Sequence, residues 1–176
     1  MKLVRWKRFS WDLAKLPPLE TTALAAQYHV RLTGREDLKA VKEVIFSAFS
    51  LDTSWSDTFK SFKDMLEMQI EQSFSPGALP PIAITHGQRI IAASTILADV
   101  AADSHLTSGP CVRIEYRNRG IGTALLHHSL KHLQQAGLTR ASAICKETAP
   151  ASKFVYPKFG STNEACDFEP TTVVHK

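Results

Sequence analysis

The sequence predicts a single α/β domain in which a mixed sheet is combined with helices. Three observations support this class. Some segments carry apolar residues at helical spacing, and others are short apolar runs bounded by Gly, Pro and polar turn residues. In addition, a glycine turn at 120–122 stands where an apolar run passes into a long amphipathic stretch. A chain of 176 residues with 44% hydrophobic and 22% charged residues suits one globular domain with its own core.

The predicted elements follow one another in the order β-α-α-β-β-β-α-β-α-β. Thr33 and Glu36 have the spacing of a capping box, which predicts a helix start after a short strand. Gly137 stands where a helix-terminating glycine is expected. The strands are predicted over 28–32, 82–85, 90–97, 111–114, 140–146 and 164–175, and the helices after 33 and over 57–73, 123–136 and 149–157.

Two apolar stripes in the first half of the chain are interpreted as core rather than as a cofactor site. They are Leu38, Val41, Ile45 and Ala48 in the first helix, and Phe59, Phe62, Leu66 and Ile70 in the second.

Residues 1–27 are expected to form an arm, separate from a domain over 28–176. The arm would pack on the domain or on a second subunit, which would make a homodimer. The net charge of +4 equals the four basic residues at its tip (Lys2, Arg5, Lys7 and Arg8), among which no acid stands. The rest of the chain is therefore neutral. A neutral body argues against an extended nucleic-acid surface, despite the sequence pI of about 9.0.

The three cysteines are Cys111, Cys145 and Cys166, an odd number without close spacing. This pattern predicts neither a zinc site nor a disulfide framework, and it favours a reducing, cytoplasmic location. No run of about 18 apolar residues is present, so no membrane span is expected.

The glycine turn is the most informative feature for function. It reads Arg117-Asn118-Arg119-Gly120-Ile121-Gly122 and leads into a helix at Thr123. A helix start preceded by glycines presents backbone N–H groups to a phosphate, and two arginines add charged donors. A Walker loop is excluded because no Gly-Lys-Ser/Thr follows, and Leu125 replaces the third glycine of a dinucleotide fingerprint. An ordinary glycine turn remains the alternative.

The segment from Arg117 to Leu126 resembles the acyl-CoA-binding motif of the GCN5-related N-acetyltransferase superfamily, and Glu115-Tyr116 resembles its lead-in. The stretch from Phe154 to Gly160 resembles a later segment of the same family. The resemblance covers about residues 28–176. It implies a sheet with helices on both faces and the use of acetyl-CoA as co-substrate.

The resemblance also assigns roles to individual residues. It implies that Arg117, Asn118, Arg119, Gly120, Ile121, Gly122 and Thr123 bind the pyrophosphate of CoA. It places the backbone N–H of Val112 at the thioester oxygen, on a strand that splays from its neighbour. It makes Tyr156 the general acid that protonates the departing thiolate. Without the resemblance, Val112 would be a plain sheet residue and Tyr156 a core aromatic.

The sequence does not identify a single residue as the general base. Asp99, Asp103, His105 and Glu115 are the candidates, and no Glu occupies the strand between Leu106 and Val112. His128 and His132 are four residues apart on a helix, but they lack the other parts of a metal motif, so no metal is assigned.

The main hypothesis is therefore an N-acetyltransferase acting on a small-molecule or peptide amine. A non-catalytic acyl-CoA-binding or regulatory module on the same fold is the alternative. Loop acids at Asp52, Asp57, Asp99 and Asp103 suggest a cationic acceptor such as a polyamine, an aminoglycoside or a peptide amine.

Overall fold

Two antiparallel sheets form the framework of the computed structural model, which describes residues 5–51 and 59–168. The four-stranded sheet has the order β2-β3-β4-β5 and the three-stranded sheet the order β6-β1-β7. The bounds are β2 Tyr28–Leu32, β3 Ile82–His86, β4 Arg89–Ile96 and β5 Leu106–Val112, with β6 Arg140–Lys146, β1 Trp6–Asp12 and β7 Thr162–Cys166. The predicted α/β class is confirmed, but the one expected sheet is divided in two, with β5 and β6 at the facing edges.

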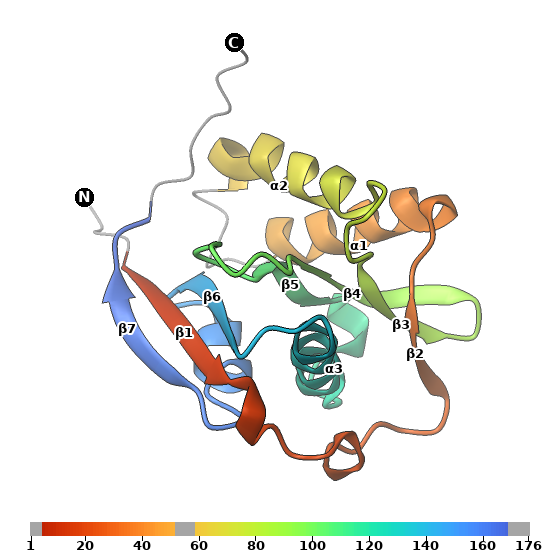
Figure 1. The fold of residues 1–176 in the computed structure, drawn as a ribbon. Helices are drawn as coiled ribbons and strands as arrows, with labels where there is room; N and C mark the ends of the chain where they lie inside the picture. Colours follow the sequence, from red (N-terminus) through yellow and green to blue (C-terminus); the bar gives the residue numbers. More distant parts are fainter. Residues whose placement is uncertain (1–4, 52–58, 169–176) are drawn as a thin grey trace.

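Helices cover both faces of the four-stranded sheet, as the family resemblance implied. Helices α1 (Leu38–Ser50) and α2 (Phe59–Ser73) lie side by side on one face, and α3 (Ile121–Gln135) lies on the other (Figure 1). The predicted stripe of α1 is core, since Val41, Ile45 and Ala48 are buried and Leu38 packs against them. In α2, Leu66 and Ile70 are buried as well.

A 3-10 turn (Arg35–Asp37) leads into α1, and this turn is capped one residue later than the sequence suggested. The Gly34 N–H donates to Asp37 Oδ2 at 2.9 Å, so Gly34 and Asp37 form the cap. The hydroxyl of Thr33 donates instead to the Pro81 carbonyl at 2.8 Å, just before β3. The predicted Thr33–Glu36 box was therefore wrong, because Thr33 already has a partner across the sheet.

The N-terminal strand is an integral part of the fold rather than a separate arm. Strand β1 lies between β6 and β7 and pairs with β6 over its whole length and with β7 over Trp6–Ser10 (Figure 1). Its large side chains alternate into the core, where Phe9 and Trp11 are almost fully buried. The expectation of an arm over 1–27 missed this, because the neighbours of β1 in the sheet lie more than a hundred residues away in the sequence.

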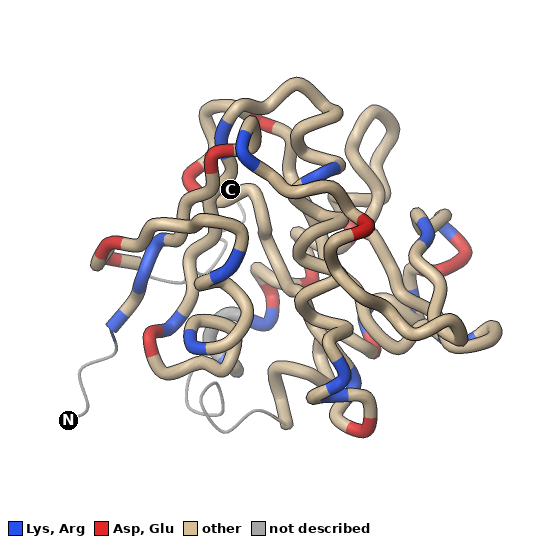
Figure 2. The backbone as a smooth tube through the Cα atoms, turned by 90° about the horizontal axis from the view of Figure 1, so that it is seen from below, with Lys and Arg blue, Asp and Glu red and all other residues tan. Residues whose placement is uncertain are grey.

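The basic residues of β1 have acidic neighbours. Lys7 lies 3.9 Å from a Glu147 oxygen, and Arg8 lies 3.9 and 3.6 Å from oxygens of Asp103 and Glu164. Figure 2 shows that Lys and Arg positions alternate with Asp and Glu positions over much of the molecule.

Other boundaries shift by a few residues. The strand expected over 111–114 is β5, which begins at Leu106, and the short helix expected over 149–157 is a π-turn at Ala151–Val155. The last strand is β7, and the rest of the predicted 164–175 strand from residue 169 onward lies outside the described residues. Among the described helices, none is long and apolar enough to cross a membrane.

Candidate functional site

The site lies in a split between the two sheets. At one end, His105, just before β5, is joined to Ser142 of β6 by two hydrogen bonds: the His105 N–H donates to the Ser142 carbonyl at 2.8 Å, and the Ser142 N–H donates to His105 Nδ1 at 3.0 Å. Beyond this joint, a cleft of about 330 Å³ is lined by residues 109–112 of β5 and by Cys145 of β6. The splay expected from the family resemblance is therefore present at these two strands.

The glycine turn forms one wall of this cleft. A short 3-10 turn (Ile114–Tyr116) follows β5, and α3 begins after Gly120. Asn118 and Gly120 both have positive φ values, 63° and 77°, which fold the loop tightly back toward the helix start. The first N–H groups of a helix have no acceptor within it, and the residues at the start of α3 that line the cleft are Gly120, Ile121, Gly122 and Thr123. The position suits an anion.

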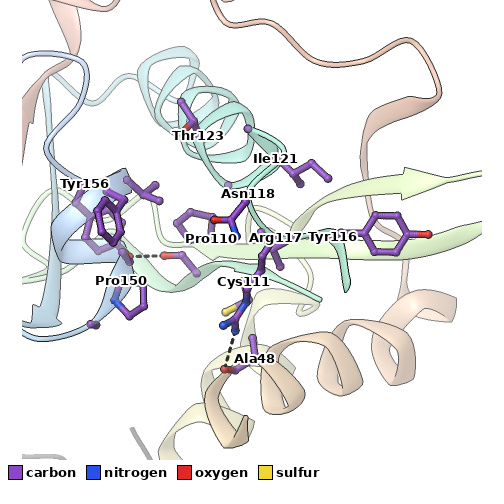
Figure 3. Close-up of a pocket in the computed structure, with 18 of the residues that line it drawn as sticks. Ala48, Pro110, Cys111, Tyr116, Arg117, Asn118, Ile121, Thr123, Pro150 and Tyr156 are labelled. Atoms are coloured by element: carbon purple, nitrogen blue, oxygen red, sulfur yellow. Dashed lines mark hydrogen bonds between the residues drawn. The ribbon is translucent and has the colours of Figure 1, made fainter. Parts of the chain in front are cut away.

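The two arginines of the turn have different surroundings. Arg117 lines the cleft, and its guanidinium donates to the Ala48 carbonyl in the last turn of α1 at 3.4 Å (Figure 3). Arg119 is not among the residues that line the cleft. Its guanidinium donates to the Tyr28 hydroxyl at 3.1 Å and to the Glu115 carbonyl at 3.2 Å, and it lies 5.3 Å from the centre of the Tyr116 ring.

A second cation reaches the cleft from another segment. Lys158 lines the cleft, and its ammonium donates to Thr123 Oγ1 at 3.0 Å, beside the first turn of α3. Lys158 lies within the Phe154–Gly160 segment, but the family resemblance assigns it no role. The sequence feature that could have pointed to Lys158 is its position two residues after Tyr156. Both side chains line the same cleft.

Tyr156 is buried at the floor of the cleft. Only 5% of its surface is exposed, and its hydroxyl donates a short hydrogen bond to the Gly109 carbonyl (Figure 3). Phe9 and Trp11 of β1 pack against its ring at centroid distances of 5.3 and 5.7 Å. Burial, together with the neighbouring thiols of Cys145 and Cys111, raises the pKa of Tyr156 well above its ordinary value. The phenol therefore holds its proton at neutral pH.

The amide of Val112 faces the split. The next amide, that of Arg113, donates to the Ile91 carbonyl on β4 at 2.9 Å. Successive amides of a strand point to opposite edges, so the N–H of Val112 points away from β4 and toward the side of β6. Just before it, the pairing of β4 with β5 shifts register between the Ala93–Cys111 and Thr95–Ser108 pairs. A Cβ on Gly109 would lie 2.9 Å from the Ala93 carbonyl, so only glycine fits this bulge.

The four candidates for a general base lie elsewhere. None of Asp99, Asp103, His105 and Glu115 is among the described residues that line the cleft. Asp52 and Asp57, the other loop acids, lie outside the described residues.

His128 and His132 lie half-buried on α3. Burial lowers the pKa of both side chains, and for His128 the neighbouring His127 and His132 add to the effect. Within the described parts of the chain, His, Cys, Asp and Glu side chains nowhere gather in a group of three that suits a metal.

The fold has clear counterparts among solved structures. A GCN5-related N-acetyltransferase from Sphaerobacter thermophilus matches with a TM-score of 0.62 and 15% identity, over 93% of this chain and 50% of that one. A GNAT-family acetyltransferase from Colwellia psychrerythraea matches with 0.62 and 16%, over 93% and 54%. A tandem GNAT protein from the clavulanic acid biosynthesis pathway matches with 0.60 and 14%, over 94% and 52%.

These likenesses establish the fold, and this chain spans about half the length of each of those three proteins. No curated protein sequence matches the chain. The sequence profile of the acetyltransferase (GNAT) family matches residues 45–160, which is more than half of the chain and includes the glycine turn and Tyr156. The resemblance noted from the sequence is thus confirmed, and the chain belongs to the GCN5-related N-acetyltransferase family.

Proposed function

We propose that the chain is an N-acetyltransferase that moves an acetyl group from acetyl-CoA to an amine by direct attack. One observation carries this proposal: the end of β5 and the nearby start of α3 meet the distant Tyr156 segment at one cleft. They bring the amide of Val112, the start of α3 and the phenol of Tyr156 to a common space. Acyl transfer needs an oxyanion donor, an anchor for the acyl carrier and a proton for the leaving group.

The glycine turn would hold the pyrophosphate of CoA. Its contacts are the backbone N–H groups from Asn118 to Thr123 and the guanidinium of Arg117. Lys158 would supply the second cation in place of Arg119, because its ammonium already lies beside Thr123. Charge-assisted hydrogen bonds of this kind are stronger than neutral ones.

The two reacting groups would act on opposite ends of the breaking bond. The Val112 N–H would stabilise the negative charge that develops on the thioester oxygen. Tyr156 would donate its proton to the departing sulfur, exchanging its bond to the Gly109 carbonyl for one to sulfur. Its raised pKa keeps this proton available, and hydrogen bonds at such sites often rearrange when substrate binds.

A non-catalytic acyl-CoA-binding module is the second candidate. The bond from Tyr156 to the Gly109 carbonyl favours it, because a tyrosine held by the main chain also serves as a packing residue. The same turn would bind CoA in this case, but Tyr156 would only hold the π-turn segment against β5.

Two measurements separate these possibilities. Calorimetry with CoA tests the binding site, and both Gly120→Asp and Arg117→Ala should weaken binding. If both variants bind like the parent, the phosphate site is misplaced.

Release of free thiol from acetyl-CoA across a panel of amines tests catalysis. Binding without amine-dependent release would support the non-catalytic module.

A further inference from the structure

One aromatic side chain of the cleft lining is largely open to solvent. Among the described residues, the aromatic side chains that line the cleft are Phe49, Tyr116, Phe154 and Tyr156. Phe154 is 69% exposed, whereas Tyr156 is buried and Phe49 packs against the core from the end of α1. A single exposed ring is common on protein surfaces and means little by itself. The position of Phe154 on a cleft wall is what gives it meaning.

Tyr116 has its ring and its hydroxyl engaged within the protein. The guanidinium of Arg119 lies 5.3 Å from the centre of the Tyr116 ring, and the Tyr116 hydroxyl lies 2.9 Å from His86 Nδ1. The ring of Tyr28 packs edge-on against it as well, at a centroid distance of 6.1 Å. Phe154 is therefore the aromatic side chain of the described lining that presents most of its surface to an incoming ligand.

The segment that carries Phe154 lies against the start of α3. A Cβ on Gly122 would lie 3.7 Å from Val155 Cγ2, and the Lys158 ammonium lies 3.0 Å from Thr123 Oγ1. Phe154 directly precedes Val155 and stands four residues before Lys158. Its ring therefore belongs to the wall that adjoins the proposed pyrophosphate site.

The same wall runs from the mouth of the cleft to its buried floor. Tyr156, which marks the thioester end in the proposal above, is 5% exposed, so the far greater exposure of Phe154 places its ring toward the mouth. From its pyrophosphate, CoA extends in two directions: the pantetheine arm leads to the sulfur, and the adenosine 3′-phosphate leads away from it. With the sulfur at Tyr156 and the pyrophosphate at the start of α3, the adenosine lies at the mouth.

The charges around Phe154 suit a nucleotide better than a cation. Residues 148–161 include Lys153 and Lys158, both exposed, and no Asp or Glu. Glu147, just before this segment, lies 3.9 Å from the ammonium of Lys7. An exposed aromatic face can also attract a cation. Two neighbouring lysines disfavour that ligand and favour the 3′-phosphate of CoA.

From the exposure of Phe154 and its place beside the start of α3, we infer that its ring is the platform on which the adenine of CoA stacks. The inference rests on the proposed acetyl-CoA-dependent function and adds a nucleoside contact to it. The base packs face to face on the phenyl ring, while the pyrophosphate is held at Gly120–Thr123. Stacking of a base on an aromatic side chain changes affinity by about tenfold.

The test is the Kd of two ligands for the parent and Phe154→Ala, measured by calorimetry. The ligands are CoA and 4′-phosphopantetheine, which lacks the adenosine but retains the arm and one phosphate. Phe154→Ala should raise the Kd for CoA about tenfold and leave the Kd for 4′-phosphopantetheine unchanged. Adenosine 3′,5′-bisphosphate, the other part of CoA, should lose affinity by the same factor as CoA.

Further variants separate stacking from a general apolar contact. Phe154→Trp should keep or increase CoA affinity, whereas Phe154→Leu retains apolar area without an aromatic face and should resemble Phe154→Ala. Because the ring is exposed, the thermal midpoint should stay near that of the parent in all three variants. Val100→Ala is the matched control, since Val100 is exposed in the loop between β4 and β5, outside the cleft lining, and it should leave CoA affinity unchanged.

A Phe154→Ala variant that binds CoA like the parent would overturn the inference. Equal losses for CoA and 4′-phosphopantetheine would overturn it too, because the ring would then contact the pantetheine arm. The failure of the proposed function gives different results. A parent chain that binds no CoA would remove the site and the adenine contact together. CoA binding without amine-dependent thiol release would refute acetyl transfer and leave the adenine contact supported by the Phe154 series.

Discussion

The indole Nε1 of Trp11 donates a hydrogen bond to the Lys158 carbonyl at 2.9 Å, across 147 positions of sequence. Trp11 lies in β1 and is fully buried, and its ring also packs against Tyr156. The N-terminal strand thus supports, from behind, the segment that carries both the phenol and the second cation of the cleft. A residue near the start of the chain thus holds in place a wall of the site that a segment near its end provides.

Trp11→Phe is the first prediction. It keeps an aromatic ring but removes the indole donor, so the Lys158 carbonyl keeps the longer bond from the Ser161 N–H, at 3.3 Å, and the segment loses its hydrogen bond to β1. A lost hydrogen bond of this kind costs about 0.5–1.5 kcal/mol. We expect weaker CoA binding by calorimetry as well as a lower thermal midpoint.

Trp6→Phe is the matched control for that experiment. Trp6 lies on the same strand, but its ring contacts Phe168 at a centroid distance of 4.7 Å, away from the cleft. The Trp6→Phe variant should therefore have a lower thermal midpoint but an unchanged affinity for CoA. Equal effects of both variants on CoA affinity would mean that β1 acts only through global stability.

The second prediction separates the two cations near the turn. Lys158→Ala removes an ammonium that lines the cleft, so the Kd for CoA should rise roughly tenfold, equivalent to about 1.4 kcal/mol. Arg119→Ala removes a guanidinium that is engaged with Tyr28 and Glu115, so the Kd should hardly change while the thermal midpoint falls. Calorimetry with CoA on both variants measures the contrast. The reverse ranking would restore Arg119 to the phosphate site.

Tyr156→Phe tests the general acid. It keeps the ring between Phe9 and Trp11 but removes the proton donor. General acid catalysis contributes about 10²–10⁴-fold, so kcat should fall by that order while CoA affinity stays nearly constant. The measurements are kcat from steady-state kinetics and the thermal midpoint, each for the parent and the variant. A near-parent kcat with only a lower midpoint would make Tyr156 a packing residue.

The local parts of this site were predictable from the sequence, and the long-range parts were not. The glycine turn and the helix after it depend on neighbouring residues, so the order strand, turn and helix could be predicted from residues 111–137 alone. The direction of the Arg119 side chain depends on Tyr28, which lies 91 positions away, and was therefore missed. The role of β1 was missed for the same reason: its alternating aromatic residues are a strand pattern, but the acidic neighbours of Lys7 and Arg8 lie far along the chain.

The last prediction concerns pH and the start of α1. The guanidinium of Arg31 donates to both oxygens of Asp37, at 2.8 and 3.0 Å, and the Gly34 N–H donates to the same carboxylate. The hydrogen bonds from Arg31, with that from Gly34, lower the pKa of Asp37 below its ordinary 3.8. A lowered pKa means that the folded state favours the charged carboxylate, so its stabilisation is complete above about pH 3.8 and is lost as the pH falls through the lower folded value.

Asp37→Asn should therefore destabilise the protein at neutral pH and matter less in acid. The loss of such a cap costs about 1 kcal/mol, or roughly 2–4 °C in the midpoint for a chain of this size. Thermal melts of parent and variant at pH 7, 5 and 3 measure it, and the difference should be similar at pH 7 and 5 and smaller at pH 3. Glu43→Gln, an exposed acid further along α1 and away from this turn, is the control and should show little difference at any of these pH values. A difference for Asp37→Asn that stays constant down to pH 3 would mean that the carboxylate charge is not what holds the start of α1.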